Sequence, residues 1–227
     1  SYFDEWFPAQ FITEAFPGQF RNWFYSLLTM STALENRPSF QTVLGHAMVR
    51  DERGAEMHKS AGNAIWFEDA ADNMGVDVMR WLFLRQNPAQ NINFGYGPAD
   101  EVRRSMFLTL WNTYAFFVTY AELDGWTPSL ALLRSAGFQA AGAGSDGASG
   151  SSPASTRAES PRHDDAAKPS SAVSYTELDR WVLSELHQLI AGVTGALQGF
   201  DAAAATKLIE AFVDDLSNWY VRRSRRR

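Results

Sequence analysis

Apolar residues recur every three or four positions over much of the chain, which predicts amphipathic helices. Three are predicted in the first part: one over residues 20–33, one over residues 68–84, and one that begins at Pro98. Their expected inner faces are, in chain order, Trp23, Phe24, Leu27, Leu28 and Met30 or Ser31; Ala70, Ala71, Met74, Val78, Trp81 and Leu82; and Val102, Met106, Leu110, Tyr114 and Phe117.

A different pattern separates the first two helices. Residues 43–49 form a short apolar run between turn-forming residues, which predicts a buried strand. The tetrapeptide Asp51-Glu52-Arg53-Gly54 then predicts a turn. Helices combined with a buried strand predict an α/β fold for this part of the chain.

The last part of the chain predicts two helices and no strand. Residues Ser174 to Glu177 fit a capping box at the start of the first helix, Gly199 ends it, and Asp201 caps the second. The two apolar stripes are Leu178, Val182, Leu186, Leu189, Val193 and Leu197, and Leu208, Ile209, Phe212, Val213, Leu216, Trp219 and Tyr220. On antiparallel helices these stripes would face each other, so the α/β part is followed by an all-α part.

The segment between the two parts is of low complexity. Between Phe138 and Val173 there is no Val, Ile, Leu, Met, Phe, Trp or Tyr, and Ala, Gly, Ser and Pro predominate. Such a composition buries too little apolar surface to offset the entropy of ordering, so residues 136–173 are predicted to be a flexible linker.

Composition narrows the possible chemistry. The 227 residues contain no Cys, which excludes a disulfide scaffold, a thiolate zinc site and a cysteine nucleophile, and fits the reducing cytoplasm. The four His residues are scattered, so no metal site is expected. No apolar run is long enough to span a membrane, and the start of the sequence does not match a signal peptide. We therefore expect an internal piece of a longer cytoplasmic protein.

The net charge of −6 conceals an uneven distribution. Five arginines lie among the last six residues, and without them 15 basic residues stand against 26 acidic ones. A local basic cluster binds phosphates whatever the total charge of the chain. The arginines at the end of the sequence are therefore candidate contacts to nucleic acid.

The most specific pattern lies directly after the predicted strand and turn, in the sequence Glu56-Met57-His58-Lys59-Ser60-Ala61-Gly62-Asn63. This sequence resembles the Lys-Met-Ser-Lys-Ser signature loop of the class I aminoacyl-tRNA synthetases, which continues with an apolar residue, Gly and Asn. Two positions depart from it: Glu56 replaces the first lysine, and His58 replaces the first serine.

Other stretches are similar to isoleucyl-type members of that family, in the same order. Gln19-Phe20-Arg21-Asn22-Trp23-Phe24 looks like the family's Gln-x-Arg-Gly-Trp-Phe, with Glu14 upstream of it, and His46-Ala47 looks like its His-Gly pair. Further matches are residues 75–80 (GVDVMR), 178–181 (LDRW) and 218–223 (NWYVRR). The resemblance covers nearly the whole chain outside the predicted linker.

The resemblance implies a domain organisation. Residues 1–95 are expected to be the C-terminal part of a Rossmann-type catalytic domain that carries the signature loop, and residues 96–135 a connecting helical region. After the linker over 136–173, residues 174–227 are expected to begin a helical-bundle anticodon-binding domain, which is incomplete here.

The resemblance also implies a ligase that activates isoleucine with ATP and Mg²⁺ and transfers it to tRNA(Ile). Lys59 is then the catalytic residue, whose ammonium group meets charge that develops on the ATP phosphates. The implied contacts are Glu56, Met57, His58, Lys59, Ser60, Gly62, Asn63 and His46 to ATP; Glu14, Gln19 and Trp23 to the aminoacyl-adenylate; and Arg222, Arg223, Arg225 and Arg226 to tRNA.

Several assignments have a plain structural alternative. Trp23 alone fits core packing, His46 alone fits a strand end, and His58 fits a surface loop as well as a source of partial charge. Trp219 and Tyr220 continue an apolar stripe and are expected in the core rather than stacked on bases.

Three other functions also stay open. A valyl- or leucyl-type synthetase fits the same loop, Glu56 allows a non-catalytic RNA-binding module derived from a synthetase, and the last helices alone allow an unrelated interaction domain. The family's other signature, His-Ile-Gly-His, is not among these 227 residues, so the chain alone is expected to be inactive.

Overall fold

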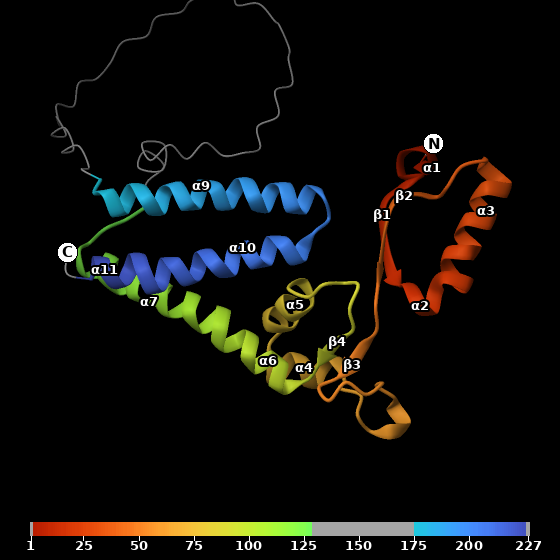
Figure 1. Ribbon diagram of the computed structural model, residues 1–227, viewed down its shortest axis with the longest axis horizontal. Coiled ribbons are helices and arrows are strands. Elements are labelled where there is room, and N and C mark those ends of the chain that lie inside the picture. Colours follow the sequence, from red (N-terminus) through yellow and green to blue (C-terminus); the bar gives the residue numbers. More distant parts are fainter. Residues whose placement is uncertain (1, 129–174, 226–227) are drawn as a thin grey trace, which may run out of the picture.

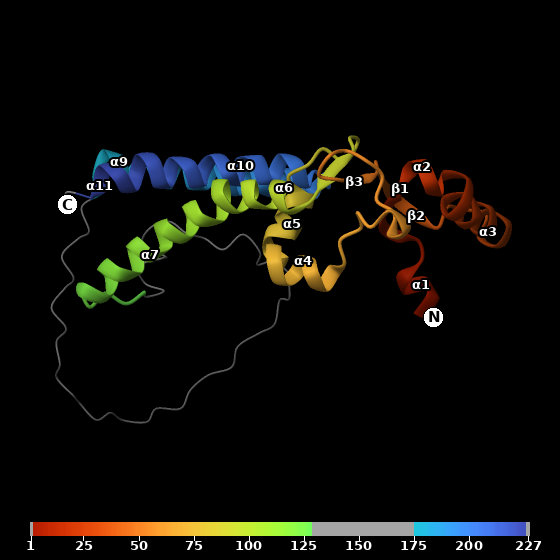
Figure 2. The same ribbon diagram turned by 90° about the horizontal axis from the view of Figure 1, so that it is seen from below.

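The computed structural model describes residues 2–128 and 175–225, which form an elongated molecule with the first strand pair at one end and the C-terminus at the other (Figures 1 and 2). The described residues are mostly helical, with two separate pairs of parallel strands. The predicted linker, residues 136–173, lies outside the described residues. Within the described part, none of the helices is long and apolar enough to cross a membrane.

The first strand pair is a βαβ unit. After α1 (Tyr2–Trp6), strand β1 (Ala9–Ala15) pairs in parallel with β2 (Phe40–His46), in register from Ala9 opposite Phe40 to Ala15 opposite His46. A continuous helical segment connects them: α2 (Phe16–Gln19), the π-helical turn η1 (Phe20–Phe24) and α3 (Tyr25–Glu35).

The helix predicted over residues 20–33 exists, but much of its expected inner face is exposed. Phe24 and Ser31 are buried, whereas Trp23, Leu28 and Met30 are exposed. A π-helical turn advances the chain by more residues per turn than an α-helix does, so a 3.6-residue period places the residues after it on the wrong side.

The predicted strand over residues 43–49 is wrong in its bounds. Strand β2 ends at His46, and a second strand, β3 (Val49–Asp51), pairs in parallel with β4 (Ile92–Phe94). The Ala47 amide donates to the Pro88 carbonyl instead of continuing the first pair. The apolar run therefore contributes residues to two strand pairs. An uninterrupted hydrophobic pattern does not show where the first strand ends and the second begins. The turn predicted at residues 51–54 is confirmed, with Gly54 at a φ of 84°.

The helix predicted over residues 68–84 is two helices, α4 (Phe67–Met74) and α5 (Val76–Leu84). Gly75 lies between them at a φ of 88°, which L side chains rarely adopt and which breaks the helix. Its predicted inner residues are nevertheless correct at four positions. They belong to the main buried cluster of the described residues, formed by Ala70, Met74, Val78, Leu82, Phe94, Ala99 and Val102.

The helix predicted from Pro98 begins two residues earlier. It runs through α6 (Tyr96–Val102), the π-helical turn η3 (Arg103–Phe107) and α7 (Leu108–Leu123). Val102 and Met106 are buried as predicted, but Leu110, Tyr114 and Phe117 are exposed. The physical reason is that α7 extends away from α4 and α5 (Figures 1 and 2), so its apolar side has left the core.

The last part is an antiparallel helix pair, as predicted (Figure 1). Helix α9 (Glu177–Gln198) packs on α10 (Ala202–Asp214), which continues through the π-helical segment η4 (Asp215–Val221) and α11 (Arg222–Ser224). Asp201 caps α10, as predicted. The capping box lies two residues later than predicted, between Thr176 and Asp179.

Within the two predicted stripes, Leu197, Leu208 and Trp219 are exposed rather than buried. Trp219 lies in η4, where the wider π-helical turn shifts the register of the stripe.

Candidate functional site

A pocket of about 300 Å³ lies where strands β3 and β4 end. Both strands point their carboxyl ends toward it, which is the edge at which open α/β folds bind ligands. The end of the loop that resembles the family signature, Gly62 and Asn63, also lines the pocket. The lining residues are Asp51, Glu52, Arg53, Gly62, Asn63, Ala64, Ile65, Phe94, Gly95 and Tyr96.

Asn63 organises the loop next to this pocket. Its Nδ2 donates to Asp51 Oδ2 and to the Glu56 carbonyl, both at 2.9 Å, and its Oδ1 accepts from the His58 amide at 3.0 Å. Gly62 adopts a φ of 70° just before it, which allows the chain to turn after the short 3-10 helix η2 (Lys59–Ala61). One side chain thus joins the start of the loop, its end and the tip of β3.

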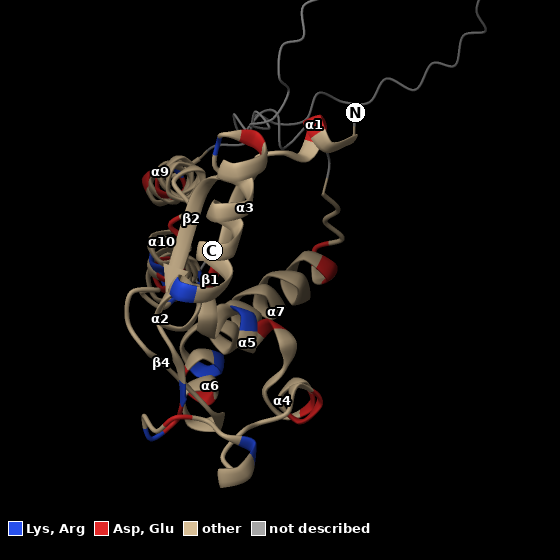
Figure 3. Ribbon diagram, turned by 90° about the vertical axis from the view of Figure 1, so that its right-hand side faces the viewer, with Lys and Arg blue, Asp and Glu red and all other residues tan. Residues whose placement is uncertain are grey.

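Asp51 stays ionised in this arrangement. The hydrogen bond from Asn63, followed by those from the Ala55 and Arg53 amides, lowers the pKa of Asp51 below its usual value of 3.8. Its neighbour Glu52 accepts from the Gly97 amide at 3.3 Å. Figure 3 shows acidic and basic residues close together in this part of the chain.

Lys59 lies on the outside of this arrangement. Its Nζ is 4.7 Å from the centre of the Trp66 ring, a cation–π contact, and both side chains are exposed. Lys59 is not among the residues that line the pocket, although Gly62 and Asn63 are. The structure therefore places its amine next to Trp66, on a short helical turn at the edge of the site.

The two departures from the family pattern contact each other. Glu56 Oε2 lies 3.5 Å from His58 Nε2, and Glu56 Oε1 lies 4.0 Å from an Arg50 guanidinium nitrogen. Arg50 is thus a cation beside Glu56, and His58 becomes a second one when it is protonated.

Glu14 and His46 lie at the carboxyl edge of the other strand pair, but on opposite faces. Glu14 pairs with Gly45 and Ala15 with His46, and neighbouring residues of a strand point to opposite sides. The Glu14 carboxylate accepts from the Ala15 amide at 2.8 Å. His46 Nδ1 lies 2.8 Å from the Ala47 carbonyl oxygen, and its ring lines a pocket of about 410 Å³ shared with Thr13, Leu44 and the start of α10.

Gln19 and Trp23 follow Glu14 directly in the chain. Gln19 ends α2, and Trp23 lies in η1 with its ring centre 5.4 Å from that of Phe24. Trp23 is 39% exposed, so core packing alone does not account for it. Figure 1 shows α2 beside the β1–β2 pair, whereas the loop over residues 56–63 adjoins the β3–β4 pair. The residues implied to contact the adenylate thus lie at the β1–β2 pair, and those implied to contact ATP lie by the β3–β4 pair, except His46, which ends β2.

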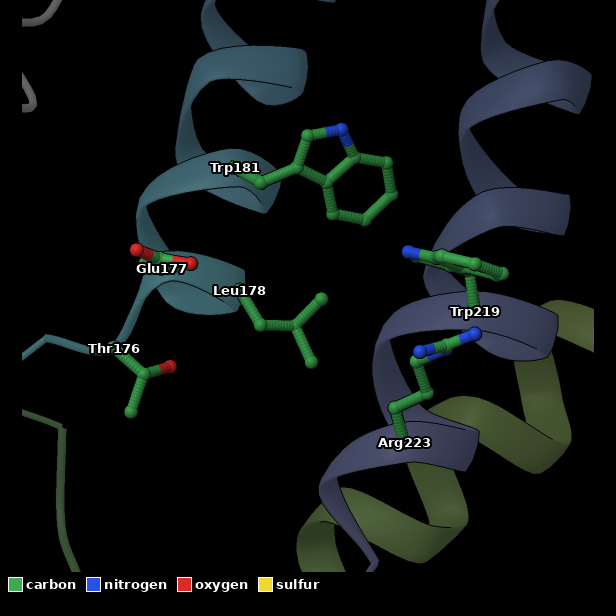
Figure 4. A pocket seen from close by; sticks show the side chains of 6 residues that line it. All are labelled: Thr176, Glu177, Leu178, Trp181, Trp219 and Arg223. Carbon is green, nitrogen blue, oxygen red and sulfur yellow. The ribbon is translucent and has the colours of Figure 1, made fainter.

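Arginines and tryptophans meet at the far end of the helix pair. Arg223 stacks on Trp219, with its Cζ 3.7 Å from the ring centre, and Arg225 lies 5.5 Å from the Phe116 ring. Figure 4 shows Trp181 on α9 pointing toward Trp219 across a shallow pocket of about 630 Å³. Arg226 lies outside the described residues.

Several residues of these sites are not predicted from the sequence. The pattern at Asp51 and Glu52 predicts only a turn, and Trp181 belongs to a short motif without an assigned role. Their lining positions depend on distant chain segments, so no local signal marked them. Within the described residues, no group of three or more His, Cys, Asp or Glu side chains is placed to hold a metal ion.

Comparison with known proteins identifies the family. Residues 1–95 match the family model of class I tRNA synthetases for isoleucine, leucine, methionine and valine, and residues 179–227 match the anticodon-binding domain of tRNA ligases. The chain belongs to the class I aminoacyl-tRNA synthetases. The synthetase signature loop, residues 56–63, falls inside the first matched region.

Two similar relatives of this chain carry the name isoleucine–tRNA ligase. The isoleucine–tRNA ligases of Dehalococcoides mccartyi strain 195 and Streptomyces avermitilis are 40% and 39% identical to it, over 97% and 99% of this chain. Each alignment covers 18% of the relative, so the chain spans less than a fifth of their length.

A solved structure supports the synthetase fold. The LeuRS of Agrobacterium radiobacter K84, in a ternary complex with tRNA and LeuAMS, matches with a TM-score of 0.60. The match covers 93% of this chain and 22% of that one, at 18% sequence identity. At this identity the likeness concerns the fold alone.

Proposed function

We propose that this chain is part of an isoleucine–tRNA ligase, which joins isoleucine to ATP as an adenylate and then transfers the acyl group to tRNA(Ile). The observation that carries the proposal is the 40% identity, over 97% of the chain, to a protein named for that activity. Valyl- and leucyl-type enzymes share the family model, so the choice of isoleucine rests on the named relatives.

In this proposal residues 1–95 belong to the second half of a Rossmann-type domain. The parallel pairs β1–β2 and β3–β4, each joined through helices, suit such a domain. Residues 96–135 connect it to residues 174–227, the start of a helical-bundle anticodon-binding domain, through the linker over 136–173. Support for the last assignment comes from the family match over residues 179–227.

Lys59 supplies charge for adenylation. The isoleucine carboxylate attacks the α-phosphate, the bond to the β-phosphate oxygen breaks, and pyrophosphate leaves with the negative charge. An ammonium group that reaches these oxygens favours the transition state over the ground state. An exposed cation–π contact is worth only about 0.5–1 kcal/mol, so leaving Trp66 costs Lys59 little.

The remaining loop residues hold Lys59 rather than reacting. Asn63 and Gly62 fix the path of the loop, and Met57 packs on the core cluster. His58 and Arg50 offset the carboxylate of Glu56, which otherwise repels a triphosphate. Ser60 and His46 complete the proposed ATP contacts.

Mg²⁺ fits this site as a companion of ATP. The pocket presents the carboxylates of Asp51 and Glu52, so it suits a nucleotide whose charge a cation has partly neutralised. Mg²⁺ offsets phosphate charge when it is bound, and one or two carboxylates with substrate phosphates are its usual partners.

Isoleucine is assigned to the β1–β2 edge and tRNA to the helix pair. Glu14, Gln19 and Trp23 contact the aminoacyl-adenylate in this proposal, and the half-exposed Trp23 ring offers an apolar wall. Arg222, Arg223, Arg225 and Arg226 contact tRNA phosphates, where guanidinium groups bind well.

Glu56 favours a second candidate function, a non-catalytic RNA-binding module derived from a synthetase. A carboxylate at the position of the family's first lysine weakens triphosphate binding, and Lys59 rests on Trp66 rather than in the pocket. The basic end of the helix pair is independent of the loop and suits RNA in either case.

Lys59→Ala in a full-length ligase that carries this sequence tests the catalytic role. We expect isoleucine-dependent pyrophosphate exchange to fall about 10²- to 10³-fold, the usual effect of removing one preorganised charge donor. Lys207→Ala is the matched control, since Lys207 is exposed on α10 and should leave exchange unchanged. Exchange that is equal in the Lys59→Ala and unmodified proteins contradicts the catalytic role.

A further inference from the structure

The carboxylate of Glu210 links helix α5, which follows the signature loop in the chain, to the helix pair α9 and α10. Trp81 Nε1 on α5 donates to Glu210 Oε1 on α10 at 2.8 Å, and Arg85 Nε lies 3.5 Å from the same oxygen. Trp81 and Glu210 are 129 positions apart in the chain. The side chains of Arg85 and Glu210 are each only about a quarter exposed, so water competes little for these contacts.

A second contact between the two helices lies one turn away. The hydroxyl of the buried Thr206 on α10 lies 3.0 and 3.1 Å from the Ala202 and Ala203 carbonyl oxygens of its own helix, and 3.4 Å from the carbonyl oxygen of Leu84, the last residue of α5. Figure 1 shows α5 in the middle of the molecule, below the first part of α10, and the two helices contact each other. Helix α5 therefore contacts α10 at successive turns, and the bond between Trp81 and Glu210 is the shorter of the two contacts.

The signature loop is attached to the same helix. Val78 and Leu82 of α5 belong to the buried core cluster, and Met57 and Ile65, near the two ends of the loop, pack against that cluster. Trp81 packs against it as well. A continuous series of packed side chains thus leads from the loop through α5 to Glu210.

We propose that Glu210 is a positioning residue that fixes α5 against α10 and thereby sets the orientation of the loop over residues 56–63 relative to helices α9 and α10. A carboxylate suits the position because it accepts from an indole N–H and pairs with a guanidinium at once. Its loss leaves the partly buried N–H of Trp81 and the charge of Arg85 without this partner.

The orientation can be measured on the 227-residue chain without any activity. The chain has no Cys, so Asp72→Cys on α4 and Gln188→Cys on α9, both exposed, accept one spin label each. We expect a single narrow distance distribution by pulsed electron paramagnetic resonance. Glu210→Ala should broaden or shift it, and Glu210→Gln, which still accepts from Trp81, should do so less.

Asp214→Ala is the matched control, because Asp214 lies on the same helix and its carboxylate accepts from Asn218 four residues on. It should leave the distribution unchanged. A distribution that is equally narrow in Glu210→Ala, in a sample with unchanged circular dichroism, overturns the proposal. A broad distribution before any substitution in α10 overturns it too. If Glu210→Ala fails to fold, Glu210→Gln and Trp81→Phe decide by the same criterion.

A second readout rests on the proposed function. In a full-length ligase, Glu210→Ala should raise the KM for tRNA or lower the rate of transfer to it by about 10- to 100-fold, and leave isoleucine-dependent pyrophosphate exchange within about twofold. A merely structural role would lower both reactions together. If the unmodified ligase shows no exchange, the proposed function fails, whereas the spin-label result on Glu210 stands by itself.

Discussion

Asn63 and Lys59 lie four residues apart in the loop, and the structure gives them different tasks. The Asn63 side chain makes three hydrogen bonds that join the start of the loop, its end and the tip of β3. The amine of Lys59 lies against the Trp66 ring, and its side chain is exposed. Within this loop, Asn63 holds the backbone in place, and Lys59 carries an exposed charge.

Asn63→Ala tests the structural task at the scale of one residue. Three hydrogen bonds are lost, one of them to a charged carboxylate, so amide hydrogen exchange over residues 56–62 should accelerate about tenfold or more. Asn73→Ala is the control, because Asn73 makes one exposed bond to the Asp69 carbonyl. Equal exchange in both variants would show that the loop keeps its shape without Asn63.

The same variant has a pH signature. Because the Asn63 bond is the largest cause of the lowered pKa of Asp51, its loss should move that pKa up toward 3.8, which carboxyl NMR titration measures. A lowered folded-state pKa stabilises the fold at pH values above 3.8, and this contribution disappears as the pH falls through the lower value. An unchanged Asp51 pKa in Asn63→Ala contradicts this account.

At the scale of elements, the break between α4 and α5 determines how these two helices pack. Gly75 separates α4 from α5 at a φ of 88° and a ψ of 136°, a conformation that suits glycine and strains other residues. This break lets α4 and α5 turn their apolar sides toward one cluster. It also gives α5 the direction in which Trp81 meets Glu210.

Gly75→Ala should therefore destabilise the protein although space is available. No atom lies within 4 Å of the added Cβ, so the cost comes from backbone strain, about 1–3 kcal/mol in the free energy of unfolding by urea. Gly18→Ala in α2 is the matched control, since it too has open space but no positive φ. It should be neutral or slightly stabilising. Equal unfolding midpoints in the two variants would refute the strain.

What the sequence predicts follows from how local each signal is. Ala70, Met74, Val78 and Leu82 are predicted and found buried, because a 3.6-residue period depends only on neighbours along the chain. The same period does not predict the helix break at Gly75 or the register shifts at the π-helical segments η1 and η4. The period also predicts that exposed residues such as Phe117 are buried, because it shows an apolar face of a helix but not what covers that face.

The candidate site divides in the same way. The loop over residues 56–63 is recognisable from its own sequence, and the Asp201 cap is recognisable from a single residue before a helix. The lining of the pocket by Asp51, Glu52 and Tyr96 depends on two strands ending together, which the sequence does not disclose. The hydrogen bond between Trp81 and Glu210 joins residues 129 positions apart, so no local sequence pattern predicts it.

At the scale of the whole molecule, the described residues form three connected parts. The β1–β2 unit carries Glu14 and Trp23, the β3–β4 unit carries the signature loop, and the helix pair carries the arginines (Figure 1). Family relationship and named relatives make these parts, in our proposal, the amino-acid, ATP and tRNA sides of one ligase. The chain spans 18% of the length of those relatives, so the activity belongs to a longer protein in this proposal.

Pyrophosphate exchange with isoleucine and with valine is the most direct measurement of the central claim. A full-length ligase carrying this sequence should exchange faster with isoleucine, by at least about fourfold in kcat/KM, since one buried methylene is worth about 0.8 kcal/mol. Residues 1–227 alone, which lack His-Ile-Gly-His, should give none. Exchange that is equal or faster with valine, absent from the full-length protein, or present in residues 1–227 alone would contradict the account.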